Sequence, residues 1–331
     1  AQAPSGITCF AVPRWRPDGS RNPMLLQRLK DKLGNRSNAS AEIELDGALA
    51  WQVGESGRGV ATIIEMVSAT RLDCVVGSAA GMRLATVAAV HHASHRQSFG
   101  KDLVAHPLMG CVLADLVLES QAATVLALRL AGAADRAGRG DEAQRALLRV
   151  ALPAAKYWVC KRTPAHAAEA LECLGGNGYV EESGMPRLYR EAPLNSIWEG
   201  SGNVTALDVL RALARTPGCA DALLAELDLA AGGDRRLDAA LDQLRELLAG
   251  LESATSVEAQ YRARRLAGLI AVALQAALLV RYLPGPLADA FCGSRLGPAA
   301  AGGPGAPFGT LPDGVGVAGI LERARVTAGA G

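Results

Sequence analysis

A carboxylate on a glycine turn is the residue of this chain best suited to do chemistry. Glu199 lies within Trp198-Glu199-Gly200-Ser201, shortly after the glycine-rich run Gly175-Gly176-Asn177-Gly178. Glycine lets a backbone approach an anion closely, and a carboxylate in a dry pocket has its pKa raised into the range of a general base. The pattern therefore indicates a base beside a loop that could meet an anion. The same four residues also fit an ordinary helix start capped by Ser201 or Asn203.

Two arginine-containing segments extend this pattern. Arg96 begins the segment Arg96-Gln97-Ser98-Phe99-Gly100, and Arg71 follows Thr70 within an apolar helical stretch. The planar guanidinium fork of Arg96 can bind two diphosphate oxygens at once. Arg71, on a helix, fits an ion pair at the helix surface or between helices.

Three histidines just before Arg96 raise the question of a metal. His91 and His95 share one helix face, with His92 beside them, but no Asp or Glu lies within a turn of them. Solvated helix histidines are therefore the better interpretation, and the sequence predicts no metal site.

The bulk composition favours a helical protein without strong charge. Half of the 331 residues are hydrophobic and only 4% are aromatic, so small and branched aliphatic side chains must fill the core, as in closely packed helices. The formal net charge of +1 is not that of a strongly basic nucleic-acid-binding domain. Seven scattered cysteines without a Cys-x-x-Cys pair predict reduced core thiols in a cytoplasmic protein.

Neither the start of the chain nor its longest apolar run indicates a secreted or membrane protein. The chain opens Ala1-Gln2-Ala3-Pro4, without a signal peptide and without Met, which suggests a fragment or a processed piece. Residues 266–280 are apolar except for Gln275, but this run is shorter than the about 20 residues that span a bilayer. We expect it to form a buried helix and expect no membrane partner.

The elements that must position these residues change type along the chain. The apolar run at residues 7–12 and the alternating run at residues 41–45 predict strands, each followed by an Asp-Gly turn. From Gly57 onward, apolar residues recur at intervals of three and four, which predicts helices. Five are expected: to about His95, from Pro107 to about Ala137, from Asp141 to about Lys161, from about Pro164, and from the Glu199 turn to about Arg215.

These elements predict three regions in a mainly α fold. Residues 1–54 hold too few strands for a stable sheet of their own and look like the C-terminal part of a middle β-domain. Residues 55–215 are expected to form an antiparallel helical bundle with up-down connections. Residues 216–331 add two or three helices and a Gly/Pro-rich tail, in which residues 297–316 are expected to be a mobile loop around an anchor at residues 308–312.

Together these motifs resemble the acyl-CoA dehydrogenase flavoproteins. The resemblance rests on Trp198-Glu199-Gly200-Ser201, on Leu174-Gly175-Gly176-Asn177-Gly178 and on the Arg-x-x-Phe-Gly segment at Arg96. Longer stretches, among them residues 28–40, 70–74 and 186–191, look like the AidB-type, alkylation-response branch of that family. The resemblance is dense over residues 7–215 and thinner afterwards. It implies that the whole protein also has an N-terminal helical domain and earlier β-strands.

The resemblance implies an FAD-dependent oxidoreductase that dehydrogenates the α and β carbons of an acyl-CoA thioester. It assigns Glu199 as the base, because Thr70 occupies the position where some relatives place theirs. It puts Arg71, Thr70 and Gly200 near the acyl-CoA. It implies an FAD shared across the subunits of a homodimer or homotetramer and contacted by eight residues of this chain: Arg96, Phe99, Glu172, Gly175, Gly176, Asn177, Ser201 and Asn203. Among these, Glu172 departs from the family, which often has an amide there.

The resemblance to the AidB-type branch also implies a second function, that of a DNA-binding protective flavoprotein with little or no dehydrogenase activity. Arg211 and Arg215 are four residues apart, on one face of the helix after Glu199, and are candidates for that role. Three more arginines follow at positions 262, 264 and 265. Clustering of the five on one exposed face would favour DNA, whereas a flavin-sized cleft beside Glu199 would favour dehydrogenation. A third possibility is a purely structural helical bundle.

Overall fold

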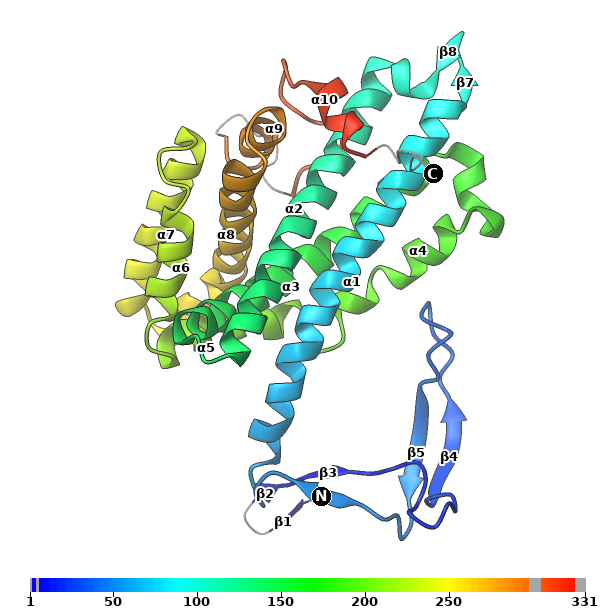
Figure 1. Cartoon of the computed structure of the whole chain (residues 1–331), viewed down its shortest axis with the longest axis vertical. Coiled ribbons are helices and arrows are strands. Elements are labelled where there is room, and N and C mark those ends of the chain that lie inside the picture. Colours follow the sequence, from blue (N-terminus) through cyan, green and yellow to red (C-terminus); the bar gives the residue numbers. More distant parts are fainter. Residues whose placement is uncertain (1, 4–5, 298–304, 325–331) are drawn as a thin grey trace. The chain divides into compact units, whose positions relative to one another are not determined.

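A computed structural model describes residues 2–3, 6–297 and 305–324. The chain divides into two compact units, Ala1–Thr70 and Arg71–Gly331, and the boundary falls within the long helix α1 (Gly59–His95). Figure 1 shows the strands of the first unit in blue and the helices of the second from cyan to red.

The first unit consists of short antiparallel strand pairs. β1 (Gln2–Ala3) pairs with β2 (Gly6–Ile7), β3 (Cys9–Ala11) with β6 (Trp51–Val53), and β4 (Met24–Leu29) with β5 (Ala41–Leu45). The register of the β4–β5 pair shifts between Leu26 and Arg28, as at a β-bulge. The strands predicted at residues 7–12 and 41–45 are confirmed. Several apolar side chains of this unit are exposed, among them Leu26 at 58% and Ile43 at 51%.

Four helices form the centre of the second unit. α3 (Glu142–Glu172) packs against α2 (Pro107–Gly138), α5 (Gly202–Arg215) and α8 (Ser256–Tyr282), and α2 and α5 also pack against α8 (Figure 1). Small residues let these helices approach closely, because alanines such as Ala114, Ala154 and Ala267 are fully buried between them. The helix predicted over residues 266–280 is confirmed as a buried part of α8.

Shorter elements complete this unit. They are β7 (Gln97–Ser98), β8 (Lys101–Asp102), α4 (Met185–Glu191), α6 (Cys219–Asp228), α7 (Arg235–Glu252), α9 (Pro286–Arg295), α10 (Val317–Glu322), and the 3-10 turns η1 (Leu103–Ala105), η2 (Gly175–Tyr179), η3 (Glu181–Ser183) and η4 (Leu194–Ser196). All seven cysteines are free thiols, and five of them are buried.

Local capping explains where several helices begin. The Asp141 carboxylate accepts a hydrogen bond from the Gln144 amide at 3.1 Å, and this bond caps the first turn of α3. Thr255 and Glu258 form a reciprocal capping box at the start of α8. Pro107 opens α2, where its missing amide hydrogen costs no helical hydrogen bond.

The helix break predicted near Pro164 is wrong. α3 is continuous from Glu142 to Glu172 and contains both Pro153 and Pro164. A proline inside a helix removes one backbone hydrogen bond and costs about 3 kcal/mol. Here Thr163 and His166, on either side of Pro164, are buried in the core, so tertiary packing outweighs the local preference.

Three of the described helices, α1, α2 and α8, have the length and hydropathy of a membrane-spanning helix. Of their most apolar windows, 50%, 67% and 78% respectively lie buried inside the protein. Core packing therefore accounts for much of the apolar character of α2 and α8.

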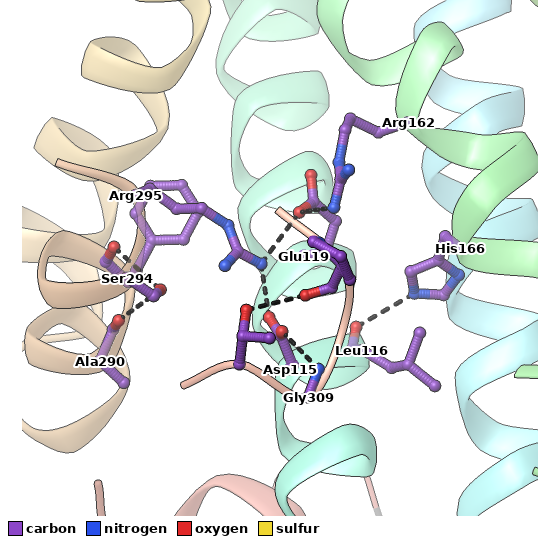
Figure 2. Close-up of polar contacts among 12 residues, drawn as sticks. Asp115, Leu116, Glu119, Arg162, His166, Ala290, Ser294, Arg295 and Gly309 are labelled. Atoms are coloured by element: carbon purple, nitrogen blue, oxygen red, sulfur yellow. Dashed lines mark hydrogen bonds and ion pairs between the residues drawn. The ribbon is translucent and has the colours of Figure 1, made fainter. Parts of the chain in front are cut away.

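A cluster of four buried ionic side chains joins three helices of the second unit (Figure 2). Arg295 of α9 pairs with Asp115 and, at 3.1 Å, with Glu119 of α2. Arg162 of α3 pairs with the same Glu119 at 3.2 Å. Burial alone would raise the pKa of Glu119, but the two arginines outweigh it and hold that pKa below its ordinary value. Two carboxylates thus balance two guanidinium groups in the core.

The C-terminal segment packs onto this cluster. The Gly309 amide donates to Asp115 at 2.9 Å (Figure 2), and the Phe308 ring lies edge-on to the His166 ring at 5.5 Å and over the Arg162 guanidinium at 4.6 Å. Phe308 is only 8% exposed, so the anchor predicted at residues 308–312 is confirmed. Residues 298–304 of the predicted mobile loop lie outside the described residues.

Candidate active site

Glu199 lies in a tight turn between η4 and α5, and its backbone is left-handed. Its φ angle is 57°, and that of Gly200 is 106°. A side chain at position 200 would place Cβ 3.0 Å from the Val204 side chain and 3.3 Å from the Arg71 guanidinium, so glycine is required there. A non-glycine residue in the left-handed region is uncommon and usually reflects a functional or structural constraint.

Arg71 holds this turn from α1. Its Nε donates to the Glu199 carbonyl oxygen at 2.9 Å, and its Nη1 donates to the Asp208 carboxylate at 2.6 Å. Asp208, on α5, also binds Arg149 of α3 at 3.0 Å. Burial alone would raise the pKa of Asp208, but the hydrogen bonds and charges of Arg149 and Arg71 outweigh it and lower that pKa. Arg71 thus forms the ion pair between helices that the sequence allowed, and it also bonds to the backbone of Glu199.

Lys156 of α3 holds the same turn from another side. Its side chain is 1% exposed, and Nζ donates to the Asn195 carbonyl at 3.0 Å and to the Gly200 carbonyl at 2.8 Å. Burial lowers the pKa of Lys156. Sequence reasoning missed this residue, although a single lysine in the apolar stretch at residues 150–159 was an available signal.

Asn195 ties the start of the turn to α1. Its Nδ2 donates to the Ser78 hydroxyl at 3.1 Å, and its Oδ1 accepts from the Trp198 indole at 2.9 Å. Among the described residues, the Glu199 carboxylate itself has no hydrogen bond or ion pair. The protein therefore fixes the backbone around Glu199 from several sides, while the described part of the chain offers its carboxylate no hydrogen bond.

Three other predicted residues have contacts of their own. Thr70 is the last residue of the first unit, and its hydroxyl donates to the carbonyls of Met66 and Val67 in α1. Ser201 is the N-cap residue of α5 but makes no side-chain capping bond. The side-chain oxygen Oδ1 of Asn203 accepts a hydrogen bond from Arg264 Nε of α8 at 2.8 Å, a contact that the sequence did not predict.

The glycine loop follows the C-terminal end of α3. Gly175 and Gly176 are exposed in η2, and a Cβ added to either would meet no atom within 4 Å. Sixteen residues of α3 separate Lys156 from Glu172, which corresponds to about 24 Å of helix. Within one chain, therefore, the structure does not bring the glycine loop to Glu199. The open glycine backbone fits a diphosphate, whereas the exposed Glu172 carboxylate at its edge does not.

The Arg96 motif forms a hairpin beyond the end of α1. Phe99 and Gly100, with φ angles of 51° and 83°, make the two-residue turn between β7 and β8. Phe99 is 92% exposed and has an edge contact with His106 at 6.0 Å. Arg96 is exposed and, among the described residues, makes no ion pair. An exposed guanidinium and an exposed ring are both available to a planar anionic ligand.

The predicted DNA-binding arginines differ in their surroundings. Arg211 is exposed and lies 3.7 Å from the Asp208 carboxylate, while Arg215 is exposed and makes no ion pair within the described part of the chain. Arg264 contacts Asn203 at the opposite end of α5, about 12 Å along the helix from Arg211. Among the described residues, no group of three or more His, Cys, Asp or Glu side chains is arranged to hold a metal ion.

Comparison with known proteins identifies relatives for most of the chain. Residues 57–214 match the family described as acyl-CoA dehydrogenase, C-terminal domain. The chain is 44% identical to the putative acyl-CoA dehydrogenase AidB of Escherichia coli, over 88% of this chain and 52% of that protein. It is 36% identical to acyl-CoA dehydrogenase family member 11 of Caenorhabditis elegans, over 62% of this chain and 34% of that protein. The chain thus spans about half the length of these curated relatives, or less.

Solved structures agree with this assignment. Caenorhabditis elegans ACDH-11 in complex with C11-CoA superposes with a TM-score of 0.80 and 29% identity, over 87% of this chain and 53% of that one. The apo-form of Bd2924 superposes with a TM-score of 0.75 and 31% identity, over 83% and 53%. An acyl-CoA dehydrogenase of Bacillus anthracis complexed with FAD shares the fold, with a TM-score of 0.67 and 18% identity, over 86% and 58%. These matches confirm the predicted family and the mainly helical fold.

Proposed function

We propose that this chain, which belongs to the acyl-CoA dehydrogenase family, carries the catalytic base of an FAD-dependent dehydrogenation of an acyl-CoA thioester. The observation that carries the proposal is the left-handed turn at Glu199. Arg71 and Lys156 hold the carbonyls of Glu199 and Gly200 from two helices, while the Glu199 carboxylate makes no hydrogen bond or ion pair among the described residues. A stability role would use the carboxylate; a free carboxylate on a fixed backbone suits proton abstraction.

In this proposal, Glu199 removes a proton from the α-carbon of the acyl thioester. A backbone amide of the same turn would donate to the thioester carbonyl as negative charge develops on that oxygen. Arg71 and Lys156 keep the turn in place, so the carboxylate does not need to reorganise during the reaction. FAD, when bound, supplies the acceptor for the hydride that leaves the β-carbon.

Two exposed segments of this chain would hold the cofactor. The backbone at Gly175, Gly176 and Asn177 allows close approach to a diphosphate, and Arg96 and Phe99 offer a guanidinium and a ring. Their distance along α1 and α3 from Glu199 supports a cofactor shared between subunits, as in a homodimer or homotetramer. The relatives crystallised with C11-CoA and with FAD support the same assignment of ligands.

The contacts of the arginines favour dehydrogenation over the DNA-binding alternative. Arg211 is partly neutralised by Asp208, Arg264 bonds to Asn203 and Arg262 bonds to the Gly250 carbonyl, so three of the five arginines already have partners within the chain. Binding to a nucleic acid depends on unpaired Lys and Arg side chains, which displace the counterions condensed on its phosphates. Arg215 remains the best candidate of this set.

The test is anaerobic titration of the purified full-length protein with a panel of acyl-CoA thioesters, followed by the flavin absorbance. We expect bleaching by at least one thioester and its loss in Glu199→Gln, which preserves size and removes the base. Glu182→Gln, an exposed carboxylate away from the turn, is the matched control and should bleach normally. Undiminished bleaching in Glu199→Gln would disprove the assignment of the base. A flavin that no thioester reduces, in a protein that shifts duplex DNA, would favour the protective function.

A further inference from the structure

Lys156 is a buried ammonium group that joins the two ends of the turn that carries Glu199. We infer that Lys156 is a positioning residue for that base, an inference that rests on the proposed function. It lies on α3, fully enclosed, and bonds to the carbonyl oxygens of Asn195 before the turn and Gly200 after it. Glu199 lies between these two anchor points, so Lys156 sets the separation of the ends of its loop.

The cost of burying this charge argues against a purely structural origin. Removing an ammonium group from water costs several kcal/mol, and an apolar side chain of the same size is often neutral or favourable for stability. The hydrogen bonds of Lys156 Nζ go to two main-chain carbonyls, and the charge of the Glu199 carboxylate also favours the ammonium form without bonding to it. Its function therefore depends on what it does to the backbone of the turn.

The backbone of the turn that Lys156 holds is in a strained, left-handed conformation. Glu199 has a φ angle of 57°, and a left-handed conformation costs a non-glycine residue roughly 1–2 kcal/mol. Arg71 holds the carbonyl of Glu199 from α1, and Lys156 holds the next carbonyl, that of Gly200, from α3. With both donors present, two adjacent peptide groups are fixed, and the direction of the Glu199 side chain is fixed with them.

The geometry also distinguishes lysine from arginine at this position. The two carbonyls converge on one compact point charge at 2.8 and 3.0 Å, whereas a guanidinium fork is planar and wider. In the enclosed core of the second unit, the larger group would displace the turn. Lys156→Arg should therefore fail to restore positioning, although it keeps the charge, and Lys156→Met should keep the packing but lose both hydrogen bonds.

The first experiment follows the turn itself, by hydrogen exchange of the 331-residue chain. In Lys156→Met we expect the hydrogen-bonded amides of residues 196–198 to exchange about tenfold faster, equivalent to the loss of about 1.4 kcal/mol of local protection. The amides of α2 and α8 should keep their protection. Lys101→Met, the same substitution at an exposed lysine of β8, is the matched control and should leave the turn unchanged. Unaltered protection of the turn in Lys156→Met would overturn the inference.

The second experiment uses the full-length flavoprotein and separates kcat from KM. Lys156→Met should lower kcat about tenfold or more, with KM for the thioester within about twofold of the parent, because the base is misplaced while the substrate site remains. Lys156→Arg should not recover kcat. An active parent whose Lys156→Met variant keeps its kcat would overturn the inference. If instead the parent reduces no flavin, the proposed function fails, and the exchange experiment still decides whether Lys156 holds the turn.

Discussion

Arg71 and Glu199 are joined by a hydrogen bond of 2.9 Å from the Arg71 Nε to the Glu199 carbonyl oxygen, although 128 positions separate them in the chain. The same guanidinium forms a buried ion pair with Asp208, in which the two side chains are 8% and 11% exposed. The conformation of the candidate base thus depends on an ion pair between α1 and α5.

Loss of that pair should destabilise the fold. Asp208→Asn would leave Arg71 buried without its counter-charge. We expect the free energy of unfolding, measured with urea, to fall by about 3–5 kcal/mol. Asp242→Asn breaks an exposed pair with Arg245, whose side chains are 73% and 43% exposed, and should cost less than about 1 kcal/mol. Equal losses in the two variants would show that the buried pair contributes no more to the free energy of unfolding than the exposed pair does.

His166 should make stability depend on pH. Burial lowers its pKa from 6.5 to about 4, so the folded state keeps it neutral while the unfolded chain binds a proton below pH 6.5. Its contribution is therefore complete above pH 6.5 and is lost as the pH falls toward about 4, by up to about 1.4 kcal/mol per pH unit.

The measurement for His166 is the urea midpoint between pH 7.5 and 5. His166→Gln should flatten the fall in stability over this range, whatever its effect at pH 7.5. His91→Gln, at an exposed histidine, should retain the slope of the parent. The same slope in all three proteins would contradict the assignment to His166.

The C-terminal anchor should be sensitive to a single methyl group. In Gly309→Ala, the new Cβ would lie 2.6 Å from a Val112 methyl at a φ angle of 81°, so both strain and a clash result. Gly314→Ala has a φ angle of 82° and meets no atom within 4 Å, so it measures the strain alone, about 1 kcal/mol. We expect Gly309→Ala to lower the thermal midpoint clearly more. A smaller shift of the thermal midpoint than that of Gly314→Ala would mean that the segment around Gly309 rearranges and avoids the clash with Val112.

The β7–β8 hairpin should trade stability against cofactor binding. Phe99→Asn creates an Asn-Gly turn, the pair preferred where both central residues have positive φ. We expect the chain to become more stable, by up to about 1 kcal/mol, and the full-length protein to bind FAD more weakly. Retained flavin affinity, measured by titration of the apoprotein, would show that the Phe99 ring is not used for the cofactor.

Local sequence signals predicted the elements better than their partners. The helix starts at Pro107 and near Asp141 follow from proline and capping chemistry, which act within one turn. The failure at Pro164 has the opposite cause, since the buried contacts of α3 with several other helices outweigh a local penalty. The sequence also predicted the tight turn at Glu199 and Gly200, because glycine acts on the local backbone.

The residues that hold the candidate site came from far along the chain. Asp208 lies 137 positions after its partner Arg71, and Lys156 lies 44 positions before Gly200. No short-range pattern encodes such pairs, because helix packing alone sets which side chains meet. A charged residue inside an apolar helical stretch was the one signal available for Lys156.

The left-handed backbone at Glu199 also bears on how this position could change over evolutionary time. A glycine there would relieve the strain and would remove no hydrogen bond of the described carboxylate, because that carboxylate makes none. Mutational drift constrained only by folding would therefore be free to replace this side chain. Under the proposed function, the reactivity of the carboxylate, and not the stability of the fold, is what keeps a glutamate at this position.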